Sequence, residues 1–258
     1  MNKREEAHRL KSVLGLSRNI VGVKFIYTEE EFNDINIKQV NFKMSYCNTV
    51  KLASKGKPFK ANFENFYCKA SARAFGLMNI DNDVASGRLY HSFRMYNSIG
   101  TAKNVQKNVT YFNHEIYGVV VQPLEQFEND PDIVIMIINP YQAMRVVQGY
   151  SYHYGIAKNI KLTGNQGLCS ECTVTPYEYN DLNVSLLCAN TRFAAKWNDE
   201  EMGVGMPYHM FDTVADGIMK TLNPSEPNSR KREILEKVKD KNLGVEIELG
   251  TSYYRSGK

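Results

Sequence analysis

The sequence lacks a long apolar segment. Its longest uninterrupted apolar run, Ile133–Ile138, has six residues, whereas a helix that crosses a bilayer needs about 20, so no membrane-spanning helix is expected. The charged N-terminal residues, Met1–His8, are not followed by the apolar segment that signal peptides need. We therefore expect a cytoplasmic protein without a membrane partner, whose cysteines are kept reduced.

A concentrated basic region is also missing. The formal net charge is +4 and is spread along the chain. The one basic cluster, Arg230–Arg232, opens a segment of mixed Glu and Lys that is typical of a solvated helix face, so no nucleic-acid partner is expected. The sequence contains no P-loop, dinucleotide fingerprint or nucleophile elbow, and its histidines lack metal-site spacing. These absences argue against nucleotide cofactors and histidine-based metal sites.

The remaining pattern predicts a globular α+β or α/β protein. We expect a single domain with a mixed β-sheet flanked by helices. The predicted strands cover residues 19–27, 115–122, 131–138, 182–187 and 202–206, and the predicted helices cover 4–15, 139–148 and 209–222. The all-apolar run 133–138 is expected to be buried on both faces.

The end of the chain is predicted to form an appendage. Residues 223–229 are rich in Pro, Asn and Ser and read as a linker. They precede a predicted helix at 232–241 and a predicted strand at 244–249. The division is therefore a cysteine-containing core at 1–222 and a C-terminal appendage at 223–258.

Five cysteines are the most informative feature that is present: Cys47, Cys68, Cys169, Cys172 and Cys188. In a reducing compartment, grouped cysteines indicate metal ligands or catalytic groups rather than disulfides. Cys47 and Cys68 each stand near the first turn of a predicted short helix that ends at a glycine, Gly56 or Gly76. A helix N-terminus stabilises a thiolate, although small buried cysteines without chemistry would give the same pattern.

The cysteine spacing leaves several kinds of site open. Structural zinc sites usually have two close pairs, and here only Cys169 and Cys172 form one. An iron–sulfur cluster accepts four thiolates from distant segments. A [4Fe–4S] cluster, a mononuclear metal site and structural or redox-active thiols all remain open at this point.

Six segments resemble the prokaryotic family known as domain of unknown function 169, in matching order from about residue 20 to residue 222. They are residues 45–53, 68–77, 138–144, 167–176, 183–192 and 202–207. The resemblance implies a soluble protein, largely of anaerobes, and matches Cys47, Cys68, Cys169 and Cys188, which leaves Cys172 as an extra. Members typically carry Cys-x-Gly-Gly at the second cysteine, where this chain has Ala70 and Ser71, so a close backbone approach there is in doubt.

We expect Cys47, Cys68, Cys169 and Cys188 to hold a [4Fe–4S] cluster. The leading hypothesis is a cluster-dependent enzyme that acts on a small polar molecule by lyase- or desulfurase-like Lewis-acid chemistry. In it, Glu171 moves protons, Arg192 binds a substrate carboxylate and Cys172 acts on substrate; alternatively, Glu171 and Arg192 form a structural ion pair.

Two other functions compete with this hypothesis. One is a non-enzymatic sensor or carrier that binds a cluster or metal, and the other is a metal-free thiol enzyme with Cys169 and Cys172 as a redox pair. The sixteen tyrosines fit pocket walls and equally a Tyr-rich core or the face of a homo-oligomer.

Overall fold

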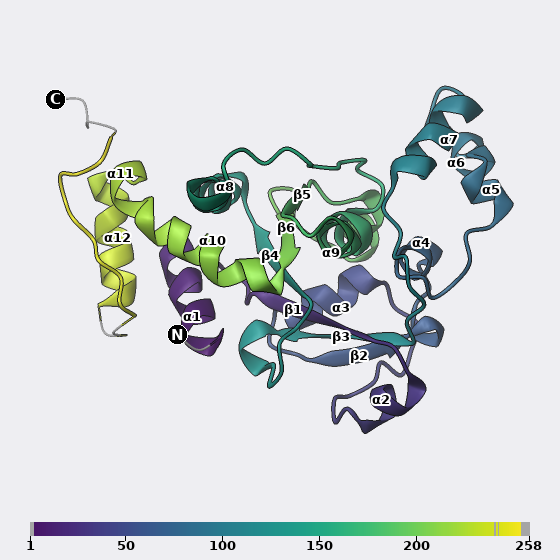
Figure 1. Cartoon of the computed structure of the whole chain (residues 1–258), viewed down its shortest axis with the longest axis horizontal. Coiled ribbons are helices and arrows are strands. Elements are labelled where there is room, and N and C mark those ends of the chain that lie inside the picture. The colour runs from purple at the N-terminus through teal and green to yellow at the C-terminus, as the bar shows by residue number, and fades with distance from the viewer. Residues whose placement is uncertain (1–2, 240, 242, 254–258) are drawn as a thin grey trace.

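The computed structural model describes residues 3–239, 241 and 243–253, and one six-stranded sheet lies at its centre (Figure 1). In spatial order the strands are β2 (Phe59–Asn62), β3 (Gly118–Pro123), β1 (Val21–Ile26), β4 (Ile133–Ile138), β6 (Met202–Pro207) and β5 (Asn183–Ser185). All neighbouring strands are antiparallel. Parallel pairing within the described part is confined to two isolated bridges, Gln39 with Lys60 and Met44 with Phe66. The predicted α+β fold, a sheet flanked by helices, is confirmed.

Helices cover both faces of the sheet. On one face lie α1 (Lys3–Leu14), α8 (Pro140–Tyr154) and α10 (Tyr208–Lys220), with α12 (Asn228–Val238) packed against α1. On the other lie α3 (Tyr46–Ala53), α4 (Lys69–Ala74), the π-helix η3 (Gly167–Val174) and α9 (Thr175–Tyr179). The cysteines belong to this second layer.

Strand β4 separates the two cores. Ile133, Ile135 and Ile137 pack on the cysteine-bearing side. The alternate residues, Val134, Met136 and Ile138, pack under α8 and α10. Each strand residue points to the face opposite its neighbour, so an all-apolar strand buried on both faces is the predicted outcome, and it is confirmed.

The first turn of α8 shows how the sequence sets a helix start. Asn139 accepts a hydrogen bond from the Gln142 amide (2.9 Å), and the Gln142 side chain accepts one from the Asn139 amide (2.9 Å). Pro140 occupies the first helical position, where its missing N–H is no loss. The helix starts as predicted and runs six residues further than expected, to Tyr154.

The predicted strand at 244–249 is wrong. These residues form no regular element and lie along the C-terminal helices, where Val245 and Ile247 are partly buried. Side chains take the place of a partner strand: Asn223 bonds the Glu246 carbonyl (3.1 Å) and the Glu248 amide (2.8 Å). An alternating apolar pattern suits such an extended segment as well as it suits a strand. The division at residue 222 stays a prediction, and part of the predicted helix 232–241 lies outside the described residues.

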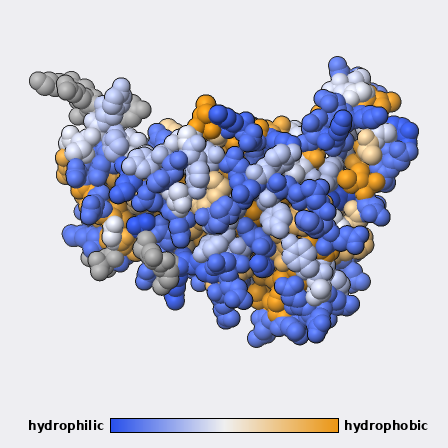
Figure 2. All heavy atoms as spheres, in the orientation of Figure 1, coloured by the Kyte–Doolittle hydropathy of each residue, from blue (hydrophilic) through white to orange (hydrophobic). Residues whose placement is uncertain are grey.

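A small helical lobe stands out from the body beside α4 (Figure 1). It consists of α5 (Asn82–Ala85), α6 (Arg88–Ser92) and α7 (Ile99–Asn108). Apolar side chains are exposed on it, among them Phe93, and the space-filling view shows apolar patches there (Figure 2). The remaining short elements are α2 (Glu29–Asp34), α11 (Leu222–Ser225), η1 (Phe63–Asn65), η2 (Leu124–Gln126) and the π-helix η4 (Asn190–Ala194).

No helix within the described ranges combines the length and the apolar character that a membrane crossing requires.

Candidate functional site

Two short helices present Cys47 and Cys68 in the same way. Cys47 is the second residue of α3, which Ser45 caps, and Cys68 is itself the N-cap of α4. A glycine with positive φ follows each helix, Gly56 (φ 92°) two residues after the C-cap of α3 and Gly76 (φ 69°) directly after the C-cap of α4, a conformation that costs glycine little. The predicted arrangement of cysteine, short helix and glycine is confirmed.

Serine occupies the position where the family pattern has a glycine after Cys68. The Ser71 hydroxyl donates to the Cys68 carbonyl (2.7 Å) within the first turn of α4, so it supports the turn that presents the cysteine. Ala70 is the preceding residue of the same turn. The side chains of Ala70 and Ser71 are therefore accommodated in the start of the helix.

Thr191 joins Cys47 to Cys188. Its Oγ1 lies 3.0 Å from Cys47 Sγ and 3.2 Å from Cys188 Sγ, so the two sulfur atoms contact the same fully buried hydroxyl. Cys188 comes just before η4, and the Arg192 amide donates to the Cys188 carbonyl (3.0 Å). Cys47 thus contacts a residue that lies 144 positions away in sequence, and Cys188 contacts the same oxygen.

The pKa values of Cys47 and Cys188 are shifted in opposite directions. The hydrogen bond from the Cys47 thiol is the main cause that lowers the pKa of Cys188, and it raises the pKa of Cys47. Burial opposes the shift at Cys188, while the Thr191 hydroxyl and the amides of Gly167 and Thr191 assist it. Cys188 is therefore the natural thiolate of the pair, and Cys47 the thiol that donates to it.

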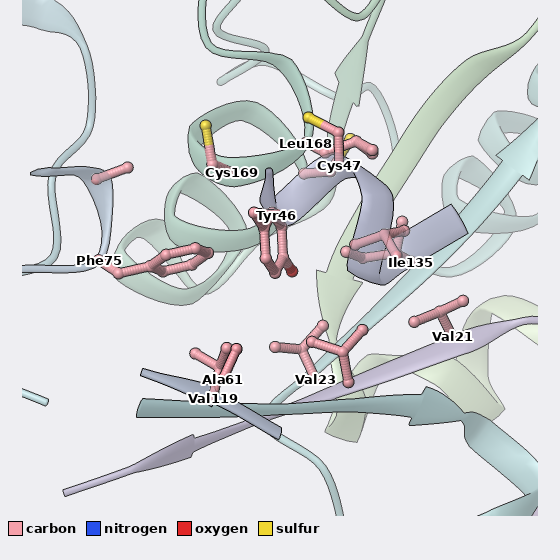
Figure 3. Packing of buried hydrophobic residues seen from close by; sticks show 14 of the residues in the cluster. Val21, Val23, Tyr46, Cys47, Ala61, Phe75, Val119, Ile135, Leu168 and Cys169 are labelled. Carbon is pink, nitrogen blue, oxygen red and sulfur yellow. The ribbon is translucent and has the colours of Figure 1, made fainter. Parts of the chain in front are cut away.

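Cys169 lies on the π-helix η3. Figure 3 shows the sulfur atoms of Cys47 and Cys169 on the side of their helices that faces away from the sheet. Burial is the main cause that raises the pKa of Cys169, and the nearby thiolates of Cys68 and Cys188 raise it further. Cys68 is half-buried, whereas the other four cysteines are buried. Cys169 thus lies within electrostatic range of Cys47, Cys68 and Cys188, and Cys68 is the cysteine nearest to solvent.

Two glycines bring η3 into place. A Cβ atom on Gly205 of β6 would lie 2.8 Å from the Cys172 Cα, and one on Gly167 would lie 2.7 Å from the Leu187 Cα. Both distances are too short for a real side chain. The missing side chains let η3 pack directly on the sheet and let the Gly167 amide reach Cys188.

Cys172 is separate from the other four. It is fully buried, and a Cβ on Gly203 would press against its sulfur. Burial, followed by the charge of Glu171, raises the pKa of Cys172. The pKa values of Cys169 and Cys172 are both raised, which is the opposite of what an activated thiol pair requires, so the structure gives no support to a redox pair at these positions.

The Glu171 carboxylate is held on both oxygens. Oε1 accepts from the Thr163 amide (2.6 Å), the Thr163 hydroxyl (3.0 Å) and the Gly164 amide (3.2 Å), and Oε2 accepts from the Ser185 hydroxyl (2.5 Å). The side chain is 2% exposed. It fastens η3 to β5 and to the preceding loop, which is a structural arrangement.

Arg192 stabilises the loops around Cys188 by hydrogen bonds to two carbonyl groups. Its guanidinium donates to the Leu186 carbonyl (3.0 Å) and to the Asn198 carbonyl. Among the described contacts there is no ion pair between Arg192 and Glu171. The roles of Glu171, Arg192 and Cys172 toward a substrate stay predictions.

The donor set suits a cluster in its chemistry. Four thiols come from four separate segments, and hydroxyl or amide donors point at the sulfur atoms of Cys47, Cys169 and Cys188, which is the usual surrounding of cluster ligands. In the conformation described, no three or more His, Cys, Asp or Glu side chains of residues 3–239, 241 and 243–253 form a group that could hold a metal ion. Cys47, Cys68, Cys169 and Cys188 are the residues that would hold a cluster.

A sizeable cavity lies away from the cysteines. A cavity of about 960 Å³ lies between β1, α2 and residues 126–130, with Lys24, Ile26 and Val120 in its wall. None of the five cysteines lines it. We place the candidate site at the cysteines because reactive groups converge there.

Comparison with known proteins identifies the family of the chain. The family model of domain of unknown function 169, described as uncharacterised ArCR proteins, matches residues 9–217. The chain belongs to this family. It is similar to the uncharacterized protein MJ0308 of Methanocaldococcus jannaschii, with 27% identity over 217 residues, 83% of this chain and 93% of the relative. No solved structure matches the chain significantly. The matched segment includes all five cysteines.

Sequence reasoning missed Thr191 and the π-helices. Thr191 lies three residues after Cys188 in a segment that carries the family resemblance, so its position was a usable signal. The π-helices η3 and η4 had none, because a π-helix has no residue signature of its own. Such helices are rare and frequently occur at functional sites.

Proposed function

We propose that this cytoplasmic protein binds a [4Fe–4S] cluster through Cys47, Cys68, Cys169 and Cys188 and acts as an enzyme on a small polar molecule. The observation that carries the proposal is the meeting of Cys47 and Cys188 at Thr191, with Cys169 and Cys68 close enough to influence the same region.

The surrounding residues suit ligand thiolates. Thr191 and the Gly167 amide donate toward Cys188 and stabilise negative charge on its sulfur. The π-helix η3 carries Cys169, the π-helix η4 follows directly after Cys188, and Glu171 bonds η3 to β5 and to the preceding loop. With all four cysteines as ligands, a bound cluster would supply electron transfer; with only three of them as ligands, the open iron would supply Lewis-acid chemistry of the lyase or desulfurase kind.

Glu171 fits a positioning role within this proposal. Its oxygens bond four donors that belong to the fold, so proton transfer by Glu171 would require these bonds to open. Cys172 faces the sheet and not the other thiols. Arg192 is half-buried beside Cys188 and remains the predicted group for a substrate carboxylate.

A non-enzymatic sensor or carrier is the second candidate. Leu186 (59% exposed) and Phe193 (81% exposed) flank Cys188 and Thr191 on the surface. Exposed apolar side chains beside a reactive centre are what a docking protein would use. A homo-oligomer in which a second copy covers them is part of this alternative.

Anaerobic purification tests both candidates. We expect a brown protein with about four iron and four sulfide per chain and a cluster spectrum. A spectrum that changes when small carboxylates or thiols are added supports the enzyme, and one that changes only with a bound protein partner supports the sensor. A colourless protein that neither contains iron nor takes up a cluster during reconstitution would contradict the proposal.

A further inference from the structure

A buried group of polar side chains lies beside the cysteines, between α4, α7 and η3. Tyr111 is at its centre: its hydroxyl donates to Gln106 Oε1 (2.9 Å) and also bonds the Gln166 side chain. Residues 110–112 are hydrogen-bonded to both η3 and α4. The Ser170 hydroxyl of η3 donates to the Thr110 carbonyl (2.8 Å), and the Phe112 amide donates to the Ala74 carbonyl of α4 (2.8 Å). The lobe and the cysteine layer therefore meet at Tyr111.

Four buried polar atoms in this group have no hydrogen-bond partner among the described residues. They are Arg73 Nε, Gln106 Nε2, Thr110 Oγ1 and Gln166 Oε1. Each of these residues is more than nine-tenths buried, with exposures of 7%, 4%, 8% and 2%. Buried polar groups are nearly always paired with protein atoms, ordered water or a ligand, so four orphans on residues around Tyr111 mark a place where a further polar partner belongs.

The group lies within electrostatic range of two cysteines. Burial raises the pKa of Tyr90 to about 12, Tyr111 and the Cys68 and Cys169 thiolates add to the rise, and the Arg73 guanidinium opposes it. Burial likewise raises the pKa of Tyr111, with Arg73 opposing and Cys169 adding. The Arg73 guanidinium and the Cys169 sulfur therefore both lie within electrostatic range of the two tyrosine hydroxyls.

The available atoms favour an anion. Arg73 carries a full positive charge, and only its Nη2 is engaged by Asp81, a half-exposed carboxylate 2.8 Å away on the outer side. Its Nε–H, the Gln106 amide N–H and the Thr110 O–H are all donors. A guanidinium with neighbouring amide and hydroxyl donors is the arrangement that binds oxyanions. Tyr111 and Cys68 are half-buried, which provides access from solvent.

We propose that Arg73, Gln106 and Thr110 form a binding site for a small oxyanion, such as a carboxylate, sulfate or phosphate, beside Cys68 and Cys169, whereas the fourth orphan, Gln166 Oε1, is an acceptor and would face a hydrogen-bond donor of the same ligand. As the site of the substrate's acidic group it rests on the proposed cluster enzyme, whereas the binding of the anion itself does not. The substrate class is then a small molecule with one acidic group, held with its remaining atoms toward the thiols.

Calorimetric titration of the full chain with acetate, sulfate and inorganic phosphate tests the site, at constant ionic strength set with chloride. We expect at least one of the three anions to bind, and the one that binds best identifies the ligand chemistry. Arg73→Gln should weaken it at least tenfold, because a hydrogen bond to a charged group is lost. Arg88→Gln removes one positive charge from an exposed position in the same lobe and should leave binding unchanged.

Gln106→Leu provides a second variant in case Arg73→Gln does not fold. It removes the orphan donor and should weaken the same anion several-fold. Absence of binding by all three anions up to about 10 mM, equal binding by Arg73→Gln and wild type, or equal losses in Arg73→Gln and Arg88→Gln would each overturn the proposal. Iron analysis separates the two proposals: protein with iron but no anion binding refutes only this site, and Arg73-dependent anion binding without iron refutes only the cluster.

Discussion

Replacing Thr191 by valine removes the hydroxyl that touches both Cys47 and Cys188 and keeps the branched shape of the side chain. Thr191 is fully buried, with its oxygen 3.0 Å and 3.2 Å from the two sulfur atoms. A hydrogen bond to a charged group contributes about 1.5–3 kcal/mol, and a tenfold change in proton affinity corresponds to about 1.4 kcal/mol. Loss of the bond should therefore raise the pKa of Cys188 by roughly one to two pH units.

The assay is residue-specific alkylation of the cluster-free protein across pH, with each cysteine quantified by peptide mass spectrometry. In the wild type, Cys188 should become reactive at a lower pH than Cys169, because the pKa of Cys188 is lowered and that of Cys169 is raised. In Thr191→Val the Cys188 midpoint should move upward, and that of Cys169 should stay in place.

Thr49→Val is the matched control. Thr49 is also fully buried, but its hydroxyl donates to the Tyr46 carbonyl (2.7 Å) and not to a sulfur. Thr49→Val should leave the midpoint pH of Cys188 alkylation unchanged. An unchanged midpoint in Thr191→Val, or an equal change in both variants, would refute the account of the thiolate.

Further predictions concern the elements that hold the site. Gly205→Ala would press a methyl group on the Cys172 backbone, so urea denaturation should show at least about 2 kcal/mol lower stability, whereas Gly100→Ala, which has room, should not. Glu171→Gln should lose about 1–3 kcal/mol and lower the iron content, and unchanged thermal stability would contradict its positioning role. Burial raises the pKa of Glu6 above 4.5, so its charged form is penalised in the fold and stability falls as pH rises through that window. Glu6→Gln should therefore melt higher than wild type at pH 7, and the difference should vanish below pH 4.

Short sequence patterns predicted the elements whose residues suit only one kind of structure. The run Ile133–Ile138 fits only a strand with two covered faces, and Asn139 with Pro140 fits a helix start. The helices that present Cys47 and Cys68 were recognisable because a glycine ends each of them. In these cases the interactions that stabilise the element are mainly between residues close together in the sequence.

The features that the sequence did not reveal depend on distant parts of the chain. The extended segment 244–249 has the alternation of a strand but lies on helices, and Asn223 supplies its hydrogen bonds. The shared contact of Cys47 and Cys188 with Thr191 depends on the packing of α3 against η4, and the polar group around Tyr111 depends on the contact of α7 and residues 110–112 with η3. The four ligand candidates were accessible from sequence through the family resemblance, while their relation to Thr191 was not.

The central claim is that Cys47, Cys68, Cys169 and Cys188, and not Cys172, hold a cluster. Its most direct test is the iron and sulfide content per chain of Cys47→Ser and Cys172→Ala, reconstituted anaerobically beside the wild type. We predict that Cys172→Ala keeps the wild-type iron and sulfide content and that Cys47→Ser loses most of both. Equal contents in the two variants, or loss in Cys172→Ala alone, would contradict the account.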